Sequence, residues 1–345
     1  MIRVETLRPE FTENYEQYLL RHPGSLIYYS SKYKNFIEAL LGCEEEYLLA
    51  LEEAEIRGVL PLMFIETARG RVYNSLPFYG SNGGVLADSA EANDSLIEAY
   101  NGIALRSDTL SATIIINPFV RQDARAIEHN HSDYRIGQFT NISFQTDAWN
   151  QILERIDSSG RRNIQKATRE GVTVEIDLSA MERLRQLHQA NIEALGGLAK
   201  AQEFFDLIPR HFTPGEDYDI YVARIDGLII AGLLLFYFNQ TVEYITPVID
   251  HEYRSLQPLS LVLITAMRDA SERGFTCWNW GGTWVSQTGV YRFKKKWAAA
   301  EQEYRYYTQL NDLSILEWPQ AKIVSTFPGF YIAPFSALKS QGETG

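Results

Sequence analysis

Residues 274–297, GFTCWNWGGTWVSQTGVYRFKKKW, constrain the fold of this chain more than any other stretch. Four of the six tryptophans lie in it, and three consecutive lysines stand near its end. The alternating, aromatic segment 275–280 predicts a half-buried β-strand. We expect Gly281 and Gly282 to end this strand, because glycine permits the positive φ of a sharp exit. A lysine behind Phe293 would then carry a cation into a cleft. The alternative is a core strand followed by a solvated basic turn.

Length and composition favour a two-domain cytoplasmic protein. A chain of 345 residues is long for one domain. It has no apolar run of membrane-spanning length and no secretory signal after its first residues. Two distant cysteines, Cys43 and Cys277, exclude a disulfide framework and a cysteine-based zinc site. His129 and His131 lack a third ligand at metal spacing, so no metal is expected. The net charge of −12 argues against DNA binding but leaves room for a local basic groove.

The first half of the sequence predicts a mixed series of strands and helices. Hydrophobic periodicity and turn residues separate these elements. The expected strands are 1–4, 47–51, 57–65, 71–78, 112–117, 134–138 and 141–145, and the expected helices are 10–21, 32–41 and about 90–106.

The second half repeats this order. Asp226-Gly227 is a strong hairpin signal, and Pro258 and Gly274 bracket a helix at 259–273. Asp147 is expected to cap a helix that runs to about residue 158, with 163–170 extending the helical region. The remaining expected helices are 180–195 and 201–211, and the expected strands are 172–176, 219–225, 228–238, 241–249 and 275–280.

Residues 47–117 and 221–280 share one order of elements: strand, turn, strand, strand, loop, helix, strand. In both segments the second strand is strongly apolar. An antiparallel meander that feeds a helix and then a parallel strand is the core order of the GNAT (acyl-CoA N-acyltransferase) fold. This order resembles the GNAT fold twice over, and the resemblance implies an α/β protein with two tandem GNAT-like domains, each a mixed, largely antiparallel sheet flanked by helices.

The run from the aromatic strand through Gly-Gly to Gly-Val-Tyr-Arg-Phe-Lys-Lys-Lys-Trp resembles the C-terminal signature of the Fem-type (FemABX) peptidyltransferases. Related GNAT-like acyltransferases of cell-wall and polysaccharide biosynthesis share this signature. The resemblance extends from about residue 25 to 308 and is sharpest at 218–297. It implies a first domain at 1–145, with the tail 310–345 packing back on it, and a second domain at 146–309.

By this resemblance the protein is an enzyme. It would transfer an acyl or aminoacyl group to an amine of a cell-envelope precursor or sugar-linked acceptor bound between the two domains. Two alternatives stay open. One is an acetyl-CoA-dependent N-acyltransferase of nucleotide sugars. The other is a binding protein that keeps the fold without turnover.

The resemblance gives Lys294 and Asp88 catalytic roles. Lys294 matches the lysine that approaches the reacting carbonyl, where a fixed ammonium stabilises the oxyanion of acyl transfer. Asp88 matches an acidic residue of the acceptor cleft, although Asp88-x-x-Glu91 is also a helix capping box. We expect Phe293 and Trp297 to anchor the segment in the core. Substrate-binding roles are implied for Lys34, Arg161, Arg162, Lys166, Tyr244, Arg254, Arg292 and Lys296.

The sequence departs from the GNAT pattern where acetyl-CoA would bind. GNAT enzymes hold its pyrophosphate with helix N-terminal amides in the pattern Arg/Gln-x-x-Gly-x-Gly/Ala. The corresponding residues 254–259, RSLQPL, lack both glycines, and Pro258 removes one amide donor. The first domain keeps glycines, at 80–84, without a basic partner.

We therefore expect no tightly bound cofactor and either aminoacyl-tRNA or acyl-CoA as the donor. The expected partner is a small-molecule amine or a nucleotide-linked acceptor. The segment after the helix around His188 lacks the arginine often found in the family, which puts a UDP-muramyl peptide acceptor in doubt.

Overall fold

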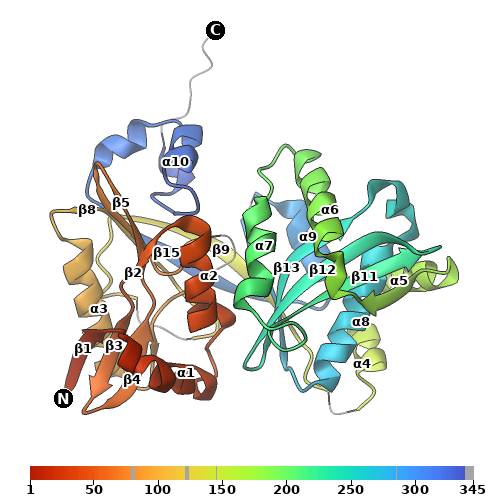
Figure 1. Cartoon of the computed structure of the whole chain (residues 1–345), viewed down its shortest axis with the longest axis horizontal. Helices are drawn as coiled ribbons and strands as arrows, with labels where there is room; N and C mark the ends of the chain where they lie inside the picture. Colours follow the sequence, from red (N-terminus) through yellow and green to blue (C-terminus); the bar gives the residue numbers. More distant parts are fainter. Residues whose placement is uncertain (79–81, 121–123, 145, 285, 339–345) are drawn as a thin grey trace, which may run out of the picture. The chain divides into compact units, whose positions relative to one another are not determined.

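The computed structural model describes residues 1–78, 82–120, 124–144, 146–284 and 286–338. The chain divides into unit 1, Met1–Arg135 with Glu303–Gly345, and unit 2, Ile136–Gln302 (Figure 1). The sequence placed these divisions at 145/146 and 309/310. None of the helices in the described ranges is long and apolar enough to cross a membrane. The expected loop residues Gly80 and Ser81, Gln145 of an expected strand, and residues 339–345 of the tail lie outside the described residues.

Unit 1 is built on two sets of paired strands. The first set has the strand order β1-β3-β4-β7, and the second set has the strand order β15-β8-β6-β5-β2. The strands are β1 (Ile2–Thr6), β2 (Glu44–Glu45), β3 (Leu48–Glu52), β4 (Glu55–Leu60), β5 (Met63–Thr67), β6 (Gly70–Asn74), β7 (Leu86–Ala87), β8 (Thr109–Ile115) and β15 (Ala300–Leu310). The helices are α1 (Thr12–Arg21), α2 (Ser31–Leu41), α3 (Ala90–Ala104) and α10 (Gln320–Thr326).

The expected single strand at 57–65 is wrong. It is two strands, β4 and β5, which belong to different sheets. Pro61 separates them because proline has no N–H to donate to a strand ladder. The expected apolar strand therefore contributes to both sheets of unit 1.

Unit 2 has one sheet with the strand order β10-β11-β12-β13-β14-β9. The strands are β9 (His131–Asn141, of which residues 136–141 pair here), β10 (Thr173–Ile176), β11 (Tyr218–Ile225), β12 (Leu228–Phe238), β13 (Thr241–Ile249) and β14 (Cys277–Thr283). The helices are α4 (Ala148–Arg155), α5 (Ser158–Arg169), α6 (Met181–Glu193), α7 (Gln202–His211), α8 (Pro258–Glu272) and α9 (Thr288–Lys295). A short 3-10 helix, η4 (His251–Leu256), precedes α8.

Turn chemistry fixes the centre of this sheet. Asp226 and Gly227 both have positive φ, 48° and 80°, so they form the tight turn that joins β11 to β12. Pro258 stands in the first turn of α8, and Gly274 with φ of 93° follows its end. The sequence predicted both features, and both are confirmed.

Three other boundaries differ from expectation. The strands expected at 134–138 and 141–145 are one long strand, β9. The helix expected from Asp147 to about residue 158 stops at Arg155, because Asp157 starts a separate helix by accepting the N–H of Ser159. The strand expected at 275–280 continues through Gly281 and Gly282 as β14, with a bulge after Asn279 instead of an end.

Both units contain the same strand–helix–strand motif. In unit 1, β6 and β8 run parallel and α3 connects them, and β8 pairs antiparallel with β15 on its other side. In unit 2, β13 and β14 run parallel around α8, and β14 pairs antiparallel with β9. The predicted fold class, α/β with a mixed, largely antiparallel sheet flanked by helices in each of two units, is confirmed, and unit 1 has a second, antiparallel sheet in addition.

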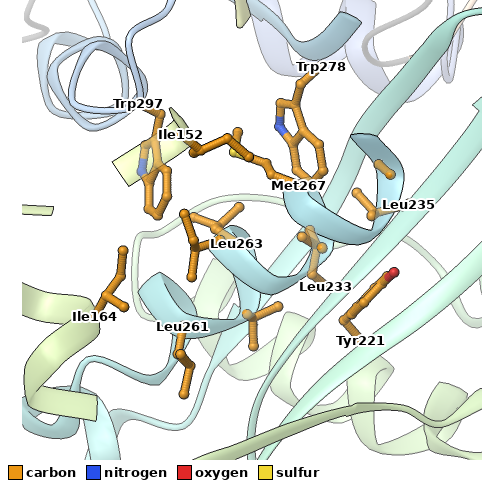
Figure 2. Close-up of a cluster of buried hydrophobic side chains, with 14 of the residues drawn as sticks. Ile152, Ile164, Tyr221, Leu233, Leu235, Leu261, Leu263, Met267, Trp278 and Trp297 are labelled. Atoms are coloured by element: carbon orange, nitrogen blue, oxygen red, sulfur yellow. The ribbon is translucent and has the colours of Figure 1, made fainter. Parts of the chain in front are cut away.

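Each unit has its own hydrophobic core. The core of unit 2 lies between α8 and its sheet, and Figure 2 shows Trp278 and Trp297 with Leu263 and Met267 of α8. Trp297 is buried and Phe293 packs against the same cluster, as the sequence predicted. In unit 1, α3 packs on residues of β6 and β8 such as Tyr73 and Ala112. In each unit the helix covers one face of the parallel strand pair, β13–β14 in unit 2 and β6–β8 in unit 1. Polar side chains lie on the other face of each pair.

Candidate functional site

The candidate site lies where the parallel strands β13 and β14 of unit 2 stop pairing. Three residue pairs join them, and the last is Glu243 with Asn279. Directly after it β13 carries a bulge, because Leu235 pairs with Tyr244 while Leu234 pairs with Thr246. In the described residues no further pair joins the two strands, although both continue. Two parallel strands that part in this way leave backbone groups and side chains for a ligand.

A buried polar network begins at this last pair. Asn279 donates from Nδ2 to Oε2 of Glu243 over 2.8 Å, and its Oδ1 accepts the N–H of Gly281 at 2.8 Å. Glu243 and Asn279 are both buried. Gly281 has a φ of 71°, a conformation that glycine adopts without a Cβ clash. The bulge in β14 therefore turns a backbone amide toward the Asn279 side chain.

Lys294 extends the network from α9. Its Nζ donates to Oγ1 of Thr283 at 2.8 Å and to the carbonyl oxygen of Gly281 at 3.3 Å. Oγ1 of Thr283 lies 3.2 Å from Oε1 of Gln138, and Gln138 donates to the carbonyl oxygen of Tyr291 at 3.2 Å. Only 4% of Lys294 is exposed. A hydrogen-bonded path therefore runs from Lys294 through Gly281 and Asn279 to Glu243.

Aromatic side chains back this network on the α8 side of the sheet. The rings of Tyr244 and Trp280 have centroids 4.9 Å apart, and Trp280 is also close to Trp297 at 6.1 Å. Nε1 of Trp280 donates to Oγ1 of Thr140 at 2.9 Å. Burial raises the pKa of Tyr244, so its hydroxyl stays protonated at neutral pH. These rings close the α8 face of the sheet behind the network.

Sequence reasoning missed the other polar side chains of this network: Gln138, Glu243, Asn279 and Thr283. Along Thr241-Val242-Glu243-Tyr244, strict alternation reads the glutamate as an outward, solvated residue. Asn279 stands between two tryptophans, so alternation likewise turns it to the face opposite theirs. The burial of both residues depends on what covers that face, which the strand pattern does not contain.

The expected loop before Lys294 is a helix. Residues 288–295 form α9, so the three lysines point in different directions. Lys294 is buried, while Lys295 is exposed and pairs with Glu301 over 2.7 Å. Lys296 is exposed, as expected.

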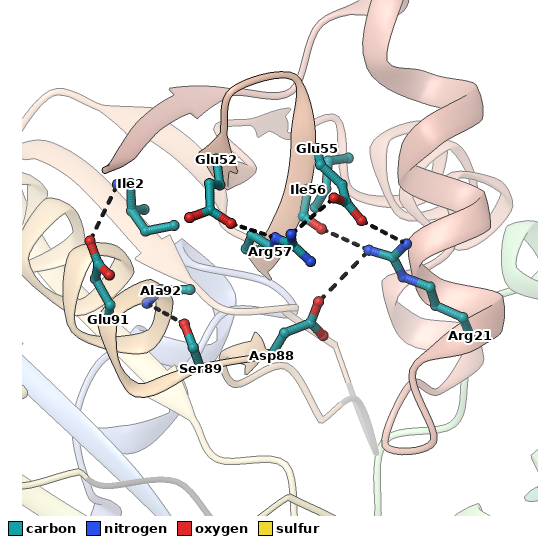
Figure 3. Close-up of polar contacts among 10 residues, drawn as sticks. All are labelled: Ile2, Arg21, Glu52, Glu55, Ile56, Arg57, Asp88, Ser89, Glu91 and Ala92. Atoms are coloured by element: carbon teal, nitrogen blue, oxygen red, sulfur yellow. Dashed lines mark hydrogen bonds and ion pairs between the residues drawn. The ribbon is translucent and has the colours of Figure 1, made fainter.

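The expected capping box at Asp88 is wrong. Ser89 is the N-cap of α3, and its Oγ accepts the N–H of Ala92 at 3.2 Å. Asp88 lies one residue too early to reach the first turn. Glu91 accepts the N–H of Ile2 at 3.4 Å instead of closing a box (Figure 3). The capping role therefore belongs to Ser89.

Asp88 itself belongs to an ion-pair network in unit 1. Its N–H donates to the carbonyl oxygen of Arg57 at 2.8 Å, and its carboxylate lies 3.7 Å from the Arg21 guanidinium. Figure 3 shows Arg21 between Asp88 and Glu55. Arg21 also lines a hollow of about 650 Å³ with the β3–β4 turn, a region that includes no residue of the expected site. The acceptor role of Asp88 stays a prediction.

Two expected substrate-binding cations have partners within their own units. Arg161 donates to the carbonyl oxygens of Leu153 and Ile156, at 3.1 and 2.7 Å, and so satisfies the C-terminal end of α4. Lys34 pairs with Glu38 one turn along α2, at 3.3 Å. Both contacts stabilise helices of the chain itself.

The other expected cations form an exposed, basic part of unit 2. Arg162, Arg254, Arg292 and Lys296 are exposed, and Lys166 is partly buried. Within the described ranges no carboxylate lies in ion-pair distance of any of them. By contrast, arginines elsewhere in the protein, such as those at positions 57, 224 and 273, are paired.

These cations gather around α5. The helix packs against α8 and η4, and Arg254 belongs to η4. At the start of α5, the N–H of Asp157 donates to the carbonyl oxygen of Lys296 at 2.8 Å. Arg162 and Lys166 lie on α5 itself, and cations beyond ion-pair distance of any carboxylate in the described residues suit phosphate groups.

The N-terminus of α8 is partly closed to a pyrophosphate. Pro258 has no N–H, and the N–H of Ser260 donates to the carbonyl oxygen of Gln257 at 3.1 Å. Gln257 has a φ of 60°, so the backbone reaches α8 through a tight turn of its own. Groups of three or more metal-ligating side chains do not occur in the part of the chain that the structure describes.

Comparison with protein families gives one match inside unit 2. Residues 158–295 match the family model of the acetyltransferase (GNAT) domain. Unit 2 is similar to a GNAT domain over most of its length. The matched segment holds β13, α8, β14 and α9, so it includes Lys294, Glu243 and Asn279.

Solved structures share the fold of the whole chain. The crystal structure of FemX matches with a TM-score of 0.70 at 15% identity, over 88% of this chain and 96% of that one. The structure of L-PGS from Bacillus licheniformis matches with a TM-score of 0.54 at 14% identity, over 95% and 99%. A tandem GNAT protein from the clavulanic acid biosynthesis pathway matches with a TM-score of 0.52 at 11% identity, over 89% and 98%. A comparison with curated proteins gave no significant match.

At these identities the likeness concerns the fold. The chain has the tandem GNAT fold, and the predicted resemblance to the Fem-type proteins is confirmed at the level of the fold. The repeated strand–helix–strand motif of units 1 and 2 is the structural basis of this likeness.

Proposed function

We propose that this protein transfers an acyl or aminoacyl group to an amine at the Lys294 network of unit 2. The observation that carries the proposal is the buried ammonium of Lys294, held by the neutral oxygens of Thr283 and Gly281 inside the GNAT domain. A lysine is costly to bury, and such cations occur where a reaction develops negative charge.

The chemistry requires two groups. The amine nitrogen attacks the carbonyl carbon, and the carbonyl oxygen gains negative charge until the ester oxygen or thioester sulfur departs. The fixed ammonium of Lys294 stabilises this oxyanion more than the neutral carbonyl. The nitrogen also gives up a proton, and the carboxylate of Glu243, linked to Lys294 through Asn279 and Gly281, is the base that the network offers.

The basic residues around α5 support a phosphate-rich donor. Arg162, Lys166, Arg254 and Lys296 carry positive charge in a protein whose net charge is −12, and no carboxylate of the described residues lies within ion-pair distance of them. Aminoacyl-tRNA fits this distribution, because its backbone offers many phosphates along an extended surface. The net charge of −12 argues against DNA as a ligand.

Acetyl-CoA is the second candidate donor. The family model, an acetyltransferase (GNAT) domain, favours it. The start of α8 argues against it, since Pro258 and the Ser260 contact remove two amides from a pyrophosphate cradle. With CoA as donor, an amine on a nucleotide sugar would be the acceptor.

For the acceptor we propose a small-molecule or nucleotide-linked amine of a cell-envelope precursor. This proposal follows the fold of FemX, and the cytoplasm would be the compartment that supplies both substrates. Asp88 of unit 1 is kept as the candidate acceptor-binding carboxylate, now with Arg21 as its neighbour.

The proposal is tested by a transfer assay with defined donors. The full-length protein is mixed with acetyl-CoA or with charged tRNA and with a panel of amine acceptors, and products are read by mass spectrometry. We expect one donor to give an acceptor heavier by one acyl or aminoacyl group. Ligands that raise the melting temperature of the protein by mass action identify which donor and acceptor to pursue. No product and no stabilisation with either donor class would leave the binding-protein alternative.

A further inference from the structure

Unit 1 holds a second copy of the strand pair that carries the site in unit 2. Its parallel ladder ends at Asn74 with Thr113, as the ladder of unit 2 ends at Glu243 with Asn279. All four of these residues are polar and buried. The repeat therefore places polar side chains at the same point in both units.

These side chains also lie on corresponding faces. Side chains alternate along a strand, so Asn74, Ser111 and Thr113 lie opposite Tyr73 and Ala112, which pack toward α3. Likewise Glu243 and Asn279 lie opposite the residues that pack toward α8. The face in question is the one away from the connecting helix in each unit.

The two faces have different occupants. In unit 2 the amide of Asn279 bonds to Glu243, and α9 adds Lys294. In unit 1 Asn74 bonds to a peptide backbone. Its Oδ1 accepts the N–H of Tyr331 at 2.7 Å, and its Nδ2 donates to the carbonyl oxygen of the same residue at 2.8 Å. An asparagine amide can pair both its donor and its acceptor with one residue of an extended chain, as a neighbouring strand would.

Further contacts hold the same segment. Oγ of Ser111 donates to the carbonyl oxygen of Ile332 at 2.8 Å, and the N–H of Phe78 donates to the carbonyl oxygen of Gly329 at 2.8 Å. Ile332 is buried, and the ring of Tyr331 lies 4.8 Å from that of Tyr306. Backbone recognition from several points, with buried side chains between them, is the pattern of a bound peptide.

We propose that Asn74 and Ser111 form a binding site for a peptide backbone, that residues 329–333 occupy it as a built-in ligand, and that this segment closes the unit 1 copy of the unit 2 site. The chain then has a single transfer site, and unit 1 takes no acyl donor. The claim that the closed copy corresponds to a transfer site rests on the proposed function. The claim that residues 329–333 occupy the site in unit 1 is independent of it.

Hydrogen exchange of the full-length protein, read by mass spectrometry, tests the occupancy. Asn74→Ala removes both bonds to Tyr331, so we expect the amides of 329–333 to exchange about tenfold faster or more. Asn117→Ala is the control, because Asn117 is also a buried asparagine of unit 1 but donates to Gly24 at 2.8 Å. It should leave exchange at 329–333 unchanged. Unchanged protection in Asn74→Ala would overturn the proposal.

Two further measurements complete the test. If Asn74→Ala does not fold, Ser111→Ala removes one bond, and we expect exchange at Ile332 and its neighbours to rise severalfold. Titration of the wild-type chain with acetyl-CoA should give at most one equivalent bound, and a second equivalent would contradict a closed unit 1. Exchange requires no turnover, so a failure of the proposed function would leave the exchange result intact, and the two failures can be told apart.

Discussion

Lys294 is the residue on which the proposed chemistry depends, and its replacement is the most direct test. Lys294→Met keeps the length of the side chain and removes the charge. Loss of one oxyanion donor costs about 3 kcal/mol, so turnover should fall roughly a hundredfold. The measurement is turnover with the donor and acceptor found in the transfer assay.

Stability must be measured beside activity. The sequence led us to expect an exposed or cleft lysine with little effect on folding, whereas Lys294 is 4% exposed. Lys294→Met removes a buried charge but leaves Thr283 without its ammonium donor, so these effects oppose each other, and we expect a change within about 2 kcal/mol.

Lys296→Met is the matched control, since Lys296 is exposed and Lys295 is not suitable because it pairs with Glu301. Full activity in a folded Lys294→Met protein would exclude the catalytic role. Equal losses in both variants would indicate general attraction of an anionic substrate.

Lys200 provides a prediction on pH. Burial lowers the pKa of Lys200 to about 8, and its ammonium lies 5.4 Å from the centre of the Phe204 ring. In the unfolded chain the pKa is about 10.4. Between these values the unfolded chain binds more protons, so the free energy of unfolding contributed by this residue rises with pH. Below about pH 8 both states are protonated, and the folded state carries the cost of a partly buried charge.

Lys200→Met should therefore raise the melting temperature at pH 7, and the gain should shrink toward pH 10. Thermal unfolding at the two pH values measures this difference. Lys296→Met removes an equal charge from an exposed position and should show no such pH dependence. A gain of the same size at both pH values would mean that packing, and not ionisation, is responsible.

Among single residues, the sequence identified Lys294 but not the network around it. A lysine after an aromatic segment stands out in a motif, whereas Glu243 looks like any outward residue of an alternating strand. Only the three-dimensional pairing of β13 with β14 brings Glu243 to Asn279. Asp88 was selected by its motif, yet Ser89 makes the helix cap. The position of a cap depends on backbone geometry at one residue, which spacing alone does not define.

At the scale of elements, the bulge of β14 connects fold and site. Gly281 has a φ of 71°, and no atom lies within 4 Å of where its Cβ would be. Gly281→Ala therefore strains the backbone without a steric clash and should cost about 1–2 kcal/mol. Its carbonyl oxygen accepts the Lys294 ammonium, so turnover should fall as well. Chemical denaturation and the transfer assay measure the two effects.

Gly289→Ala is the control from the same motif. Gly289 lies in α9, and its Cβ would also meet open space. Alanine is the better helix former, so this variant should be more stable by about 0.5–1 kcal/mol. If both substitutions change stability by the same amount and sign, the positive φ of Gly281 has no role in positioning the lysine.

The types of most elements were predictable, and their ends were less so. Helix α8 and the β11–β12 hairpin have local signals, a proline, a glycine and an Asp-Gly turn, which act through their own backbone preferences. The division of 57–65 into β4 and β5 depends on which sheet each part joins. The sequence contains the proline but not the partner strands. Tertiary pairing decides such cases.

At the scale of the molecule, the repeated order of elements predicted a duplicated fold, and the structure has one. The two copies differ in the segment that covers the polar face of the parallel strand pair, at the point where the two strands stop pairing. In unit 2 it is α9 with Lys294, and in unit 1 it is the segment 329–333. The repeat in the sequence ends before both segments, so element order could not reveal this difference. Only the copy in unit 2 presents Lys294 at this face, so the duplicated fold is consistent with a single transfer site in unit 2.

The last prediction concerns the donor and the charge of the whole protein. If a phosphate-rich donor lies over α5, replacing Arg162, Lys166 and Arg169 with glutamine should weaken tRNA binding. The slope of log affinity against log salt should also fall, by about 0.7 for each phosphate that the protein no longer neutralises. Arg3, Arg8 and Arg305 of unit 1, replaced together, change the net charge equally and serve as the control. A chain of net charge −12 repels RNA except where cations gather, so the site of substitution should matter more than the total charge. Equal reductions in affinity for both triple variants would contradict a donor site at α5, and saturable binding of acetyl-CoA without any binding of tRNA would favour the CoA-dependent reaction.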